Sequence, residues 1–292
     1  MLGKHPTRKR PCPKSHPRIK RREKREKEMN EILKGLCEMI KQAGKMMLSA
    51  KELEAGGKVK EKEGDAANMV TEYDIAVQRF LLDGIRALLP DAVFFAEEKE
   101  NDTAVLNEAH CFVIDPIDGT ANFVHGYRHS AISVAMISKG EAVLALVYDP
   151  YLDEMFTAEK GKGAFVNGKK ISVSRRDSAH AIVGFGTSPY RKDLAPLTFR
   201  LAEAFFVSCS DVRRSGAASL DLAYLAAGRL DIFFECILSV WDFAAGVLLI
   251  KEAGGVVTTM EGAEIDLRRP VSVLAAGAKN HEFAKKLIEK SK

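Results

Sequence analysis

The sequence predicts an α+β protein in which a half built on an antiparallel sheet is followed by a mixed α/β half. Three observations support this. Apolar residues recur at helical spacing early in the chain. Between Ala131 and Ile171, short strand-like runs are separated only by Gly, Asp-Pro and Asn-Gly turns. Beyond residue 172, strand-like and helical patterns alternate. We therefore expect two layered halves, residues 29–171 and residues 172–292.

The bulk composition is typical of a soluble globular protein. Hydrophobic residues make up 46% of the chain and charged residues 29%. No segment approaches the roughly 18 consecutive apolar residues of a membrane helix, and none near the start resembles a signal peptide. The five cysteines are scattered and form no C-x-x-C pair. We therefore expect a cytoplasmic protein that does not enter a membrane, with reduced, structural thiols.

The first 28 residues differ from the rest in charge. They contain 12 Lys and Arg against 3 Glu, a net charge of +9, whereas the remaining chain has a net charge of −5. Several prolines and few apolar residues make residues 1–28 a disordered basic tail in our prediction. Such a tail is suited to contact nucleic acid or another anionic surface. The alternative interpretation is that translation starts at Met29.

The next segments predict two helices separated by a loop. From Met29 to Met47, apolar residues recur at the spacing of an amphipathic helix. Residues 51–69 are polar, charged and glycine-containing, which predicts a mobile loop. Thr71 is a suitable N-cap for the second helix, and this places Asp74 in the first helical turn.

Two predicted strands then end in carboxylates. The run AVFF leads to Glu97 and Glu98, and the run CFVI leads to Asp115, with Asp118 three residues later beside a Gly-Thr turn. Side chains at strand ends emerge from a rigid support into a crevice, where ligands bind. Two acids placed together repel each other unless a cation lies between them. The alternative is that DPIDG is simply a turn, because Asp, Pro and Gly all favour turns.

In the C-terminal half, strand and helix patterns follow one another. AIVGFG and LDIFFE predict strands, and ASLDLAYLAAG predicts a helix with Gly228 at its C-cap. Trp241 and Asp242 open an apolar helix that Gly254 and Gly255 terminate. VVTT, SVLAAG and a last amphipathic helix complete the chain.

Acids at element ends indicate a magnesium site. They are Asp74, Glu97, Asp115, Asp118 and Asp242. Hard divalent cations prefer oxygen ligands, and converging carboxylates without histidine or cysteine favour Mg²⁺ over Zn²⁺. Two such ions clamp the attacking and leaving oxygens of a phosphoryl group. Phosphate ester hydrolysis is the reaction that this set of acids suits.

Other chemistries fit less well. Aspartyl-phosphate enzymes use Asp-x-Asp-Gly-Thr, whereas two residues separate Asp115 from Asp118. The Cys-x5-Arg spacing at Cys12 lies in the basic tail without a preceding strand. A G-x-S-x-G elbow is missing from the sequence, and a glycosidase would not need five acids. We expect His125 and His129 to be structural.

Three ordered motifs resemble the inositol monophosphatase family. They are AEE at residues 96–98, DPIDGTANFVHG at 115–126 and WDFAAGVLLIKEAGG at 241–255. The likeness spans nearly everything after Met29. It implies an αβαβα layered sandwich that uses two or three Mg²⁺ ions to remove phosphate from a small-molecule monoester.

The resemblance also implies metal-binding and catalytic residues. Glu97, Asp115 and the Ile117 carbonyl would hold the first ion, and Asp115, Asp118 and Asp242 the second. The first ion's water would be the nucleophile, with Thr120 and Asp74 orienting and deprotonating it. The second ion would stabilise the departing alkoxide.

The substrate-binding residues implied by the resemblance come from both halves. Gly119 and Thr120 would bind phosphate oxygens. Substrate hydroxyls are expected at Gly216, Ala217, Ala218, Glu235 and Asp242. The loop 59–68 resembles the family's mobile lid, with Lys60 or Lys62 beside a further metal.

The exact substrate and partners stay open at this stage. Inositol 1-phosphate is favoured by ANFVHG and Glu235, and fructose 1,6-bisphosphate, histidinol phosphate and 3′-phosphoadenosine 5′-phosphate are alternatives within the family. Another class is a regulatory protein that binds RNA polymerase or RNA and keeps the phosphatase fold, to which the tail 1–28 would contribute. A homodimer is expected only by analogy with relatives.

Overall fold

The computed structural model describes the backbone of residues 17–50, 59–62 and 65–292, and the side chains of residues 27–50 and 71–292. In this part, the helices are α1 (Pro17–Leu48), α2 (Glu72–Leu88), α3 (Thr120–Val124), α4 (Ala195–Ser208), α5 (Ala218–Ala226), α6 (Val240–Glu252) and α7 (Ala278–Ser291). The strands are β1 (Val59–Lys62), β2 (Asp65–Thr71), β3 (Val93–Ala96), β4 (Cys111–Asp118), β5 (Ala131–Ser138), β6 (Glu141–Asp149), β7 (Glu154–Glu159), β8 (Gly163–Val166), β9 (Lys169–Ile171), β10 (Ile182–Phe185), β11 (Asp211–Arg213), β12 (Ile232–Leu238), β13 (Val256–Thr258) and β14 (Val271–Ala276).

The first half is organised on a seven-stranded sheet. Its strands lie in chain order from β3 to β9, and every neighbouring pair is antiparallel except β3 and β4. Tight turns keep the strands in this order. Between β8 and β9, for example, Asn167 and Gly168 have φ values of 47° and 76°, which an Asn-Gly pair adopts readily. The predicted antiparallel sheet is confirmed.

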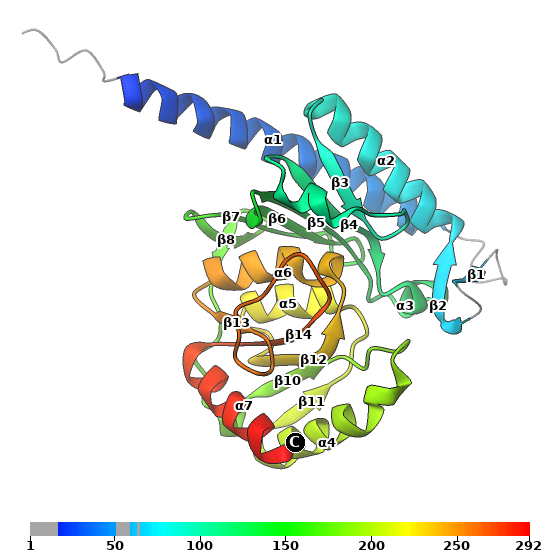
Figure 1. Ribbon diagram of the computed structural model, residues 1–292, viewed down its shortest axis with the longest axis vertical. Coiled ribbons are helices and arrows are strands. Elements are labelled where there is room, and N and C mark those ends of the chain that lie inside the picture. The colour runs from blue at the N-terminus through cyan, green and yellow to red at the C-terminus, as the bar shows by residue number, and fades with distance from the viewer. Residues whose placement is uncertain (1–16, 51–58, 63–64) are drawn as a thin grey trace, which may run out of the picture.

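One face of this sheet is covered by α1 and α2 (Figure 1). Leu36 and Ile40 on α1 and Leu81 on α2 are fully buried. They belong to one apolar cluster with Phe112 and Leu144 of the sheet. The helical spacing of these residues therefore gives each helix a stripe that removes apolar area from water, at about 25 cal/mol per Å².

The second half is built on a five-stranded mixed sheet in the order β11-β10-β12-β14-β13. The pairs β10–β11 and β10–β12 are parallel, whereas β12–β14 and β13–β14 are antiparallel. Helices α4 and α7 pack on its outer face, where Phe205 and Ile288 are buried with Phe234. Phe234 stacks between Phe185 and Phe205, with ring centroids 5.8 Å and 5.0 Å away.

Helices α5 and α6 lie between the two sheets and complete the αβαβα sandwich (Figure 1). Leu222 on α5 and Phe243 on α6 share a buried cluster with Val113 of the first sheet and Phe233 of the second. The last residue of α6, Glu252, accepts hydrogen bonds from the N–H groups of Gly161 (2.7 Å) and Gly163 (2.8 Å), which belong to the β7–β8 region. The layered fold implied by the three motifs is confirmed.

Three local details differ from the sequence prediction. Helix α1 begins at Pro17, not Met29, because the Lys, Arg and Glu residues in between are good helix formers. Residues 1–16 lie outside the described part. An antiparallel pair, β1 and β2, lies in and just beyond the predicted loop 51–69, where the mixed apolar and polar residues show no regular alternation. Strand β4 continues past Asp115 to Asp118.

Among the described residues, no helix is long and apolar enough to cross a lipid bilayer. Cys37, Cys111, Cys209 and Cys236 carry free thiols. Burial raises the pKa of the Cys111 thiol to about 12 and that of Cys209 to about 11. These thiols are therefore protonated and poorly nucleophilic at neutral pH.

Candidate active site

A single pocket between the two halves brings the predicted site residues together. It is lined by Glu97, Asp115, Ile117, Asp118, Gly119 and Thr120 from the first half and by Gly216, Ala217, Ala218, Glu235 and Asp242 from the second. Asp74 is the one predicted residue that does not line it. Residues more than 120 positions apart in the chain therefore meet at one point, close to the ends of β3 and β4 and the starts of α5 and α6.

An irregularity in β4 directs two carboxylates to the same side. In a regular strand, residues three positions apart point to opposite faces. Here Asp115 pairs with Ser133 and Asp118 with Ala131, so three steps on β4 match two on β5. Pro116, which has no N–H to donate, lies in this bulge. The bulge thus turns the DPID sequence into a pair of acids that face one pocket.

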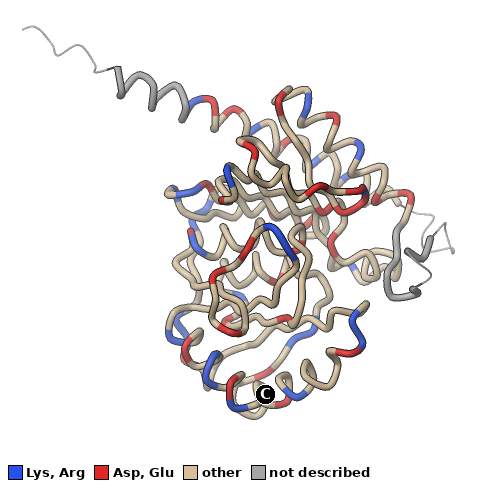
Figure 2. Tube along the Cα trace, viewed as in Figure 1, with Lys and Arg blue, Asp and Glu red and all other residues tan. Residues whose placement is uncertain are grey.

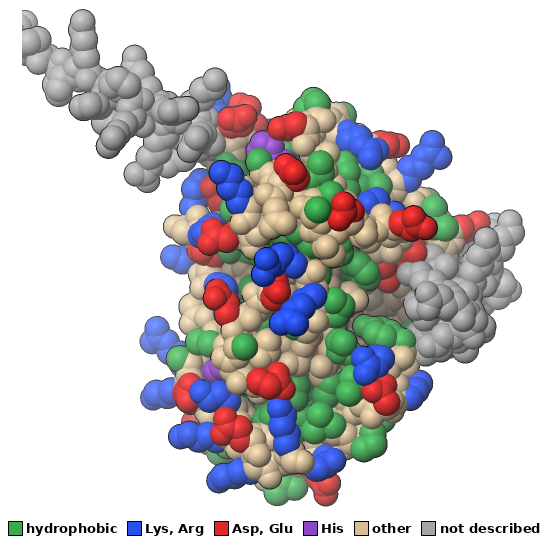
Figure 3. Space-filling model, viewed as in Figure 1, with side chains coloured by type: hydrophobic (Ala, Val, Ile, Leu, Met, Phe, Trp, Pro, Cys, Tyr) green, Lys and Arg blue, Asp and Glu red, His purple; other side chains and the backbone are tan. Residues whose placement is uncertain are grey.

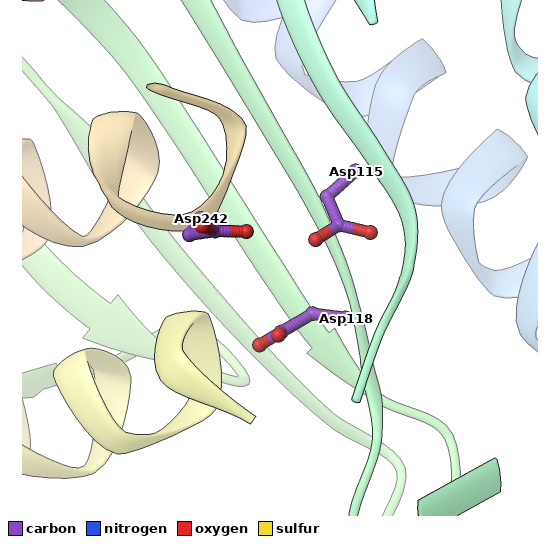
Figure 4. Close-up of side chains that lie close together, drawn as sticks. All are labelled: Asp115, Asp118 and Asp242. Carbon is purple, nitrogen blue, oxygen red and sulfur yellow. The ribbon is translucent and has the colours of Figure 1, made fainter. Parts of the chain in front are cut away.

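The carboxylates of Asp115, Asp118 and Asp242 converge (Figure 4). One oxygen of each lies within 4.8 Å of the others. Figure 2 shows acidic residues gathered in this region, between the upper and lower layers. Burial, and then the neighbouring charges of Glu97 and Asp118, raise the pKa of Asp115 well above its usual value. An acid cluster of this kind is stabilised by a bound cation.

Asp118 is held by the first turn of α5. Its carboxylate accepts hydrogen bonds from the N–H of Ala218 (3.3 Å), the N–H of Ser219 (2.7 Å) and the hydroxyl of Ser219 (2.6 Å). Burial raises the pKa of Asp118 to about 6, although the bonds from Ser219 act in the opposite direction. The N-terminus of α5 therefore favours the charged form of this acid.

Asp242 occupies the corresponding position on α6. It is the third residue of that helix and forms a capping box with Ser239, whose N–H donates to the Asp242 carboxylate at 2.7 Å. The capping box fixes the side chain on the pocket side of the helix. Burial, followed by the charge of Asp118, raises its pKa well above the usual value.

The donor set fits hard divalent cations. Three carboxylates converge, and Glu97 lies beside Asp115 closely enough to form a side-chain hydrogen bond that raises the Asp115 pKa. Ile117, whose carbonyl accepts from the Thr120 hydroxyl, also lines the pocket. The candidate donors are all oxygen atoms, and neither histidine nor cysteine is among the described residues that line the pocket. Mg²⁺ prefers such a set, whereas Zn²⁺ usually takes nitrogen or sulfur ligands.

Asp74 lies behind the pocket and reaches it through Thr120. The capping box of α2 buries Asp74 completely, with the N–H of Thr71 donating to its carboxylate at 2.7 Å. The Thr120 hydroxyl lies 3.3 Å from the other carboxylate oxygen of Asp74 and 3.1 Å from the Ile117 carbonyl. The predicted Thr120–Asp74 pair is thus in hydrogen-bonding contact.

Glu235 forms the far wall of the pocket. Its carboxylate accepts a hydrogen bond from the N–H of Ser188 (2.8 Å) and another from the Ser188 hydroxyl (3.1 Å). Burial raises its pKa to about 7. Gly186 permits this packing, because a Cβ at that position would lie 1.9 Å from a carboxylate oxygen of Glu235.

Comparison with known proteins settles the family. The model of the inositol monophosphatase family matches residues 28–292. An inositol-1-monophosphatase of Rhizobium meliloti is 40% identical over 229 residues, which cover 76% of this chain and 82% of that protein. The chain belongs to the inositol monophosphatase family.

Other relatives of this chain are named Nus factor SuhB or extragenic suppressor protein suhB. The Nus factor SuhB of Salmonella typhimurium is 40% identical over 214 residues, covering 73% of this chain and 80% of that protein. The solved structure of extragenic suppressor protein suhB from Bartonella henselae superimposes with a TM-score of 0.81. The two sequences are 31% identical, and the superposition covers 90% of this chain and 99% of the Bartonella henselae chain.

Several pocket residues were not predicted from the sequence. Asp221, Arg214 and Tyr190 also line the pocket. Asp221 accepts a hydrogen bond from the Ser215 hydroxyl, and burial raises its pKa to about 8. The position of Asp221 in the first turn of α5 was the available signal, since acids in first helical turns had already marked Asp74 and Asp242. For Tyr190 no such signal exists.

The two histidines do not share a helix face, because α3 ends at Val124. His125 is exposed, and the His129 ring packs edge-on against Tyr224 at 5.9 Å between centroids. Burial lowers the pKa of His129, which is consistent with a neutral, structural ring. The side chains of Lys60 and Lys62 lie outside the described residues.

Proposed function

We propose that this member of the inositol monophosphatase family is a Mg²⁺-dependent phosphomonoesterase that hydrolyses inositol 1-phosphate. The observation that supports the proposal best is the convergence of Asp115, Asp118 and Asp242 beside a Thr120–Asp74 pair. The candidate metal ligands line the pocket, and Asp74, which could accept a proton, lies behind it in contact with Thr120. A site that only bound a cation would not need the second feature.

The residues would form two ligand sets that share one acid, Asp115. Glu97, Asp115 and the Ile117 carbonyl form one set, and Asp115, Asp118 and Asp242 form the other. Bound Mg²⁺ would supply Lewis-acid chemistry, lowering the pKa of a coordinated water and stabilising charge on phosphate oxygens. The shared carboxylate of Asp115 would keep the two positions close.

Thr120 and Asp74 would orient the attacking water and remove its proton. The Thr120 hydroxyl can donate to Asp74 and accept from a water at the same time. Asp74 is fully buried and hydrogen-bonded to Thr71 in the capping box of α2, so its carboxylate cannot swing away. The proton would pass from the water through the Thr120 hydroxyl to the Asp74 carboxylate.

Substrate groups would be held by both halves. The backbone at Gly119 and Thr120 would bind phosphate oxygens, because α3 starts there and helix N-termini favour anions. Gly216, Ala217, Ala218, Glu235 and Asp242 would contact the polyol hydroxyls. The name of the Rhizobium meliloti relative, an inositol-1-monophosphatase, supports inositol 1-phosphate over the other phosphates.

The test is a kinetic comparison of four phosphate esters in the presence of Mg²⁺. Phosphate release from inositol 1-phosphate is expected to show the highest kcat/KM, above fructose 1,6-bisphosphate, histidinol phosphate and 3′-phosphoadenosine 5′-phosphate. An Asp115→Asn variant tests the metal assignment and is expected to lose activity. Full activity in this variant would contradict that assignment, and a higher kcat/KM for another ester would show that inositol 1-phosphate is not the preferred substrate.

A second function is favoured by the relatives named Nus factor SuhB. In this alternative the chain is a regulatory protein that binds RNA or RNA polymerase, and the basic residues 1–28 contribute. The described surface in Figure 3 shows Lys and Arg interspersed with Asp and Glu, not a wide basic area on that face. RNA binding that weakens with salt and disappears on deletion of residues 1–28 would support this alternative.

A further inference from the structure

The side chain of Asn122 joins the two halves beside the pocket. Its amide nitrogen donates one hydrogen bond to the carbonyl of His129 (2.7 Å) and another to the carbonyl of Ser215 (2.8 Å). An asparagine amide has two N–H groups, so both are used. The first bond stays within the N-terminal half, and the second reaches the loop that precedes α5.

The two halves approach each other closely at this link. Gly119 has a φ of 82°, and a Cβ there would lie 3.0 Å from the carbonyl oxygen of Gly216. Gly216 has a φ of 93°, and a Cβ there would lie 3.1 Å from the Asn122 amide nitrogen and 2.5 Å from the Arg214 guanidinium. Both glycines are required by backbone conformation and by space. The Asn122 amide therefore packs directly against Gly216.

The loop is held on its other side by α5. The Ser215 hydroxyl donates to Asp221, while the Ser215 carbonyl accepts from Asn122. Ser215 is thus fixed between α3 and α5. Asn122 itself is half-buried and does not line the pocket, so it acts on the pocket through the loop and does not touch the substrate.

We propose that Asn122 is a positioning residue that sets the loop 214–216 against the phosphate-binding turn at Gly119, and thereby aligns the polyol-binding wall with the metal cluster. The inference rests on the proposed function for its substrate. Asp118 also crosses between the halves, through Ala218 and Ser219. That contact fixes the start of α5, whereas Asn122 fixes the residues that precede the helix.

If Asn122 positions this loop, its loss should weaken polyol binding and leave metal binding unchanged. Without the amide donors, the carbonyls of Ser215 and His129 lose their partner and the loop becomes free to move. The carboxylates of Asp115, Asp118 and Asp242 keep their own supports. The KM for inositol 1-phosphate should therefore rise while the affinity for Mg²⁺ stays the same.

The experiment compares Asn122→Ala and Asn122→Asp with the natural protein. The Asp variant keeps the shape but replaces the two N–H donors by an acceptor. In both variants we expect the KM for inositol 1-phosphate to rise about 10-fold or more, with kcat less affected. The KM for p-nitrophenyl phosphate, which has no polyol, should change less than about twofold. Calorimetric titration with Mg²⁺ should give an unchanged dissociation constant.

A matched control is Asn280→Ala. The amide of Asn280 on α7 donates to the carbonyl of Arg176 at 3.0 Å, and its side chain is buried, but it is remote from the pocket. This variant should lose thermal stability without a change in KM. Hydrogen exchange adds a readout that does not depend on activity. Backbone amides of residues 214–219 should exchange faster in the Asn122 variants and not in the Asn280 variant.

The possible results distinguish the role of Asn122 from the proposed function. Faster exchange at 214–219 together with a selective rise in KM supports the proposal. Unchanged exchange, an equal rise in KM for both esters, or weaker Mg²⁺ binding would overturn it. If the natural protein does not hydrolyse inositol 1-phosphate, the proposed function fails, whereas the exchange data still decide whether Asn122 holds the loop.

Discussion

The acids of the N-terminal half reach the pocket from the ends of strands, whereas two acids of the C-terminal half reach it from the first turns of helices. Each half lines the pocket with three acids, which are Glu97, Asp115 and Asp118 from the ends of β3 and β4, and Asp221, Asp242 and Glu235 from α5, α6 and β12. The halves differ in the support that they give to these acids, because the N-terminus of α5 donates hydrogen bonds across to Asp118.

The two aspartates of β4 show what this difference does. Asp118 receives three hydrogen bonds from the start of α5, and its pKa rises only to about 6. Asp115 accepts a hydrogen bond from the N–H of Ile117 within the same turn and forms a side-chain hydrogen bond with Glu97, and its pKa is raised well above its usual value. The C-terminal half therefore prepares one acid to be charged and leaves the other dependent on a cation.

The largest expected effect follows from neutralising Asp115. In Asp115→Asn, kcat/KM for the phosphate ester should fall at least about 10³-fold, or about 4 kcal/mol of transition-state stabilisation. The amide oxygen can still accept from the Ile117 N–H, and a buried charge that repels its neighbours is removed. The melting temperature in EDTA should therefore not decrease, while the rise caused by added Mg²⁺ should disappear.

Differential scanning calorimetry with and without Mg²⁺ measures both parts of this prediction. If Asp115→Asn lowered the melting temperature of the metal-free protein by several degrees, its carboxylate would be a stabilising group. The contrast between Asp115 and Asp118 would then be wrong.

A smaller effect on the kinetics is expected from a change in the pocket wall that Glu235 forms. In Gly186→Ala, the new Cβ would lie 1.9 Å from the Glu235 carboxylate, so either the loop or Glu235 must move, at a cost of about 1–3 kcal/mol in unfolding free energy. The KM for the polyol phosphate should rise about 10-fold while Mg²⁺ affinity stays unchanged. Steady-state kinetics and Mg²⁺ titration measure this separation.

Gly140→Ala is the matched control for that variant. Gly140 has a φ of 81° and no atom within 4 Å of the added Cβ, so the substitution should cost only the backbone strain of about 1–2 kcal/mol. An unchanged KM in Gly186→Ala would show that Glu235 does not contact the substrate.

The smallest effect tests the support that α5 gives to Asp118. Ser219→Ala removes the hydroxyl bond at 2.6 Å and keeps the backbone bond, so the pKa of Asp118 should rise further, by about 0.5–1 unit. Because metal binding needs the charged carboxylate, protons would then compete with the metal ion for Asp118 up to a higher pH. The acid limb of the pH–activity profile should move to higher pH by the same amount, with little change at pH 8.

Thr198→Val is a control for the loss of a buried hydroxyl. Thr198 on α4 contacts the Cys236 sulfur at 3.2 Å, away from the pocket. Its pH profile should match that of the natural protein. An unshifted acid limb in Ser219→Ala would mean that the serine hydroxyl does not stabilise the charged form of Asp118.

The sequence predicted the layers and the carboxylate cluster because local signals mark both. Asp-Pro, Gly-Thr and the Trp-Asp helix start show where elements end, and acids at those points identify Glu97, Asp115 and Asp242. The β4 bulge was not predicted, because DPID reads as a turn that ends a strand. The pairing of β1 with β2 was missed because VKEK and DAANMVT show no regular alternation of apolar and polar residues.

The contacts of Asn122 could not be predicted from sequence patterns. Its carbonyl partner at Ser215 lies 93 positions along the chain, and an asparagine in a turn is ordinarily explained by local hydrogen bonds. Tyr190 was missed because no local pattern marks it, whereas Asp221 carried a signal that was not used, its place in the first turn of α5. The assigned roles of the individual site residues remain predictions.

Helix α6 is hydrogen-bonded to the first sheet at both ends. Near its start the carbonyl of Trp241 accepts from the Ser133 hydroxyl on β5 at 3.4 Å, and Glu252 at its end accepts from the N–H groups of Gly161 and Gly163. Its apolar side chains are shared between both sheets, so a fragment that ended before α5 would expose the inner face of the first sheet. Although the molecule has two sheets, it should therefore unfold as one cooperative unit, without a hinge between its halves.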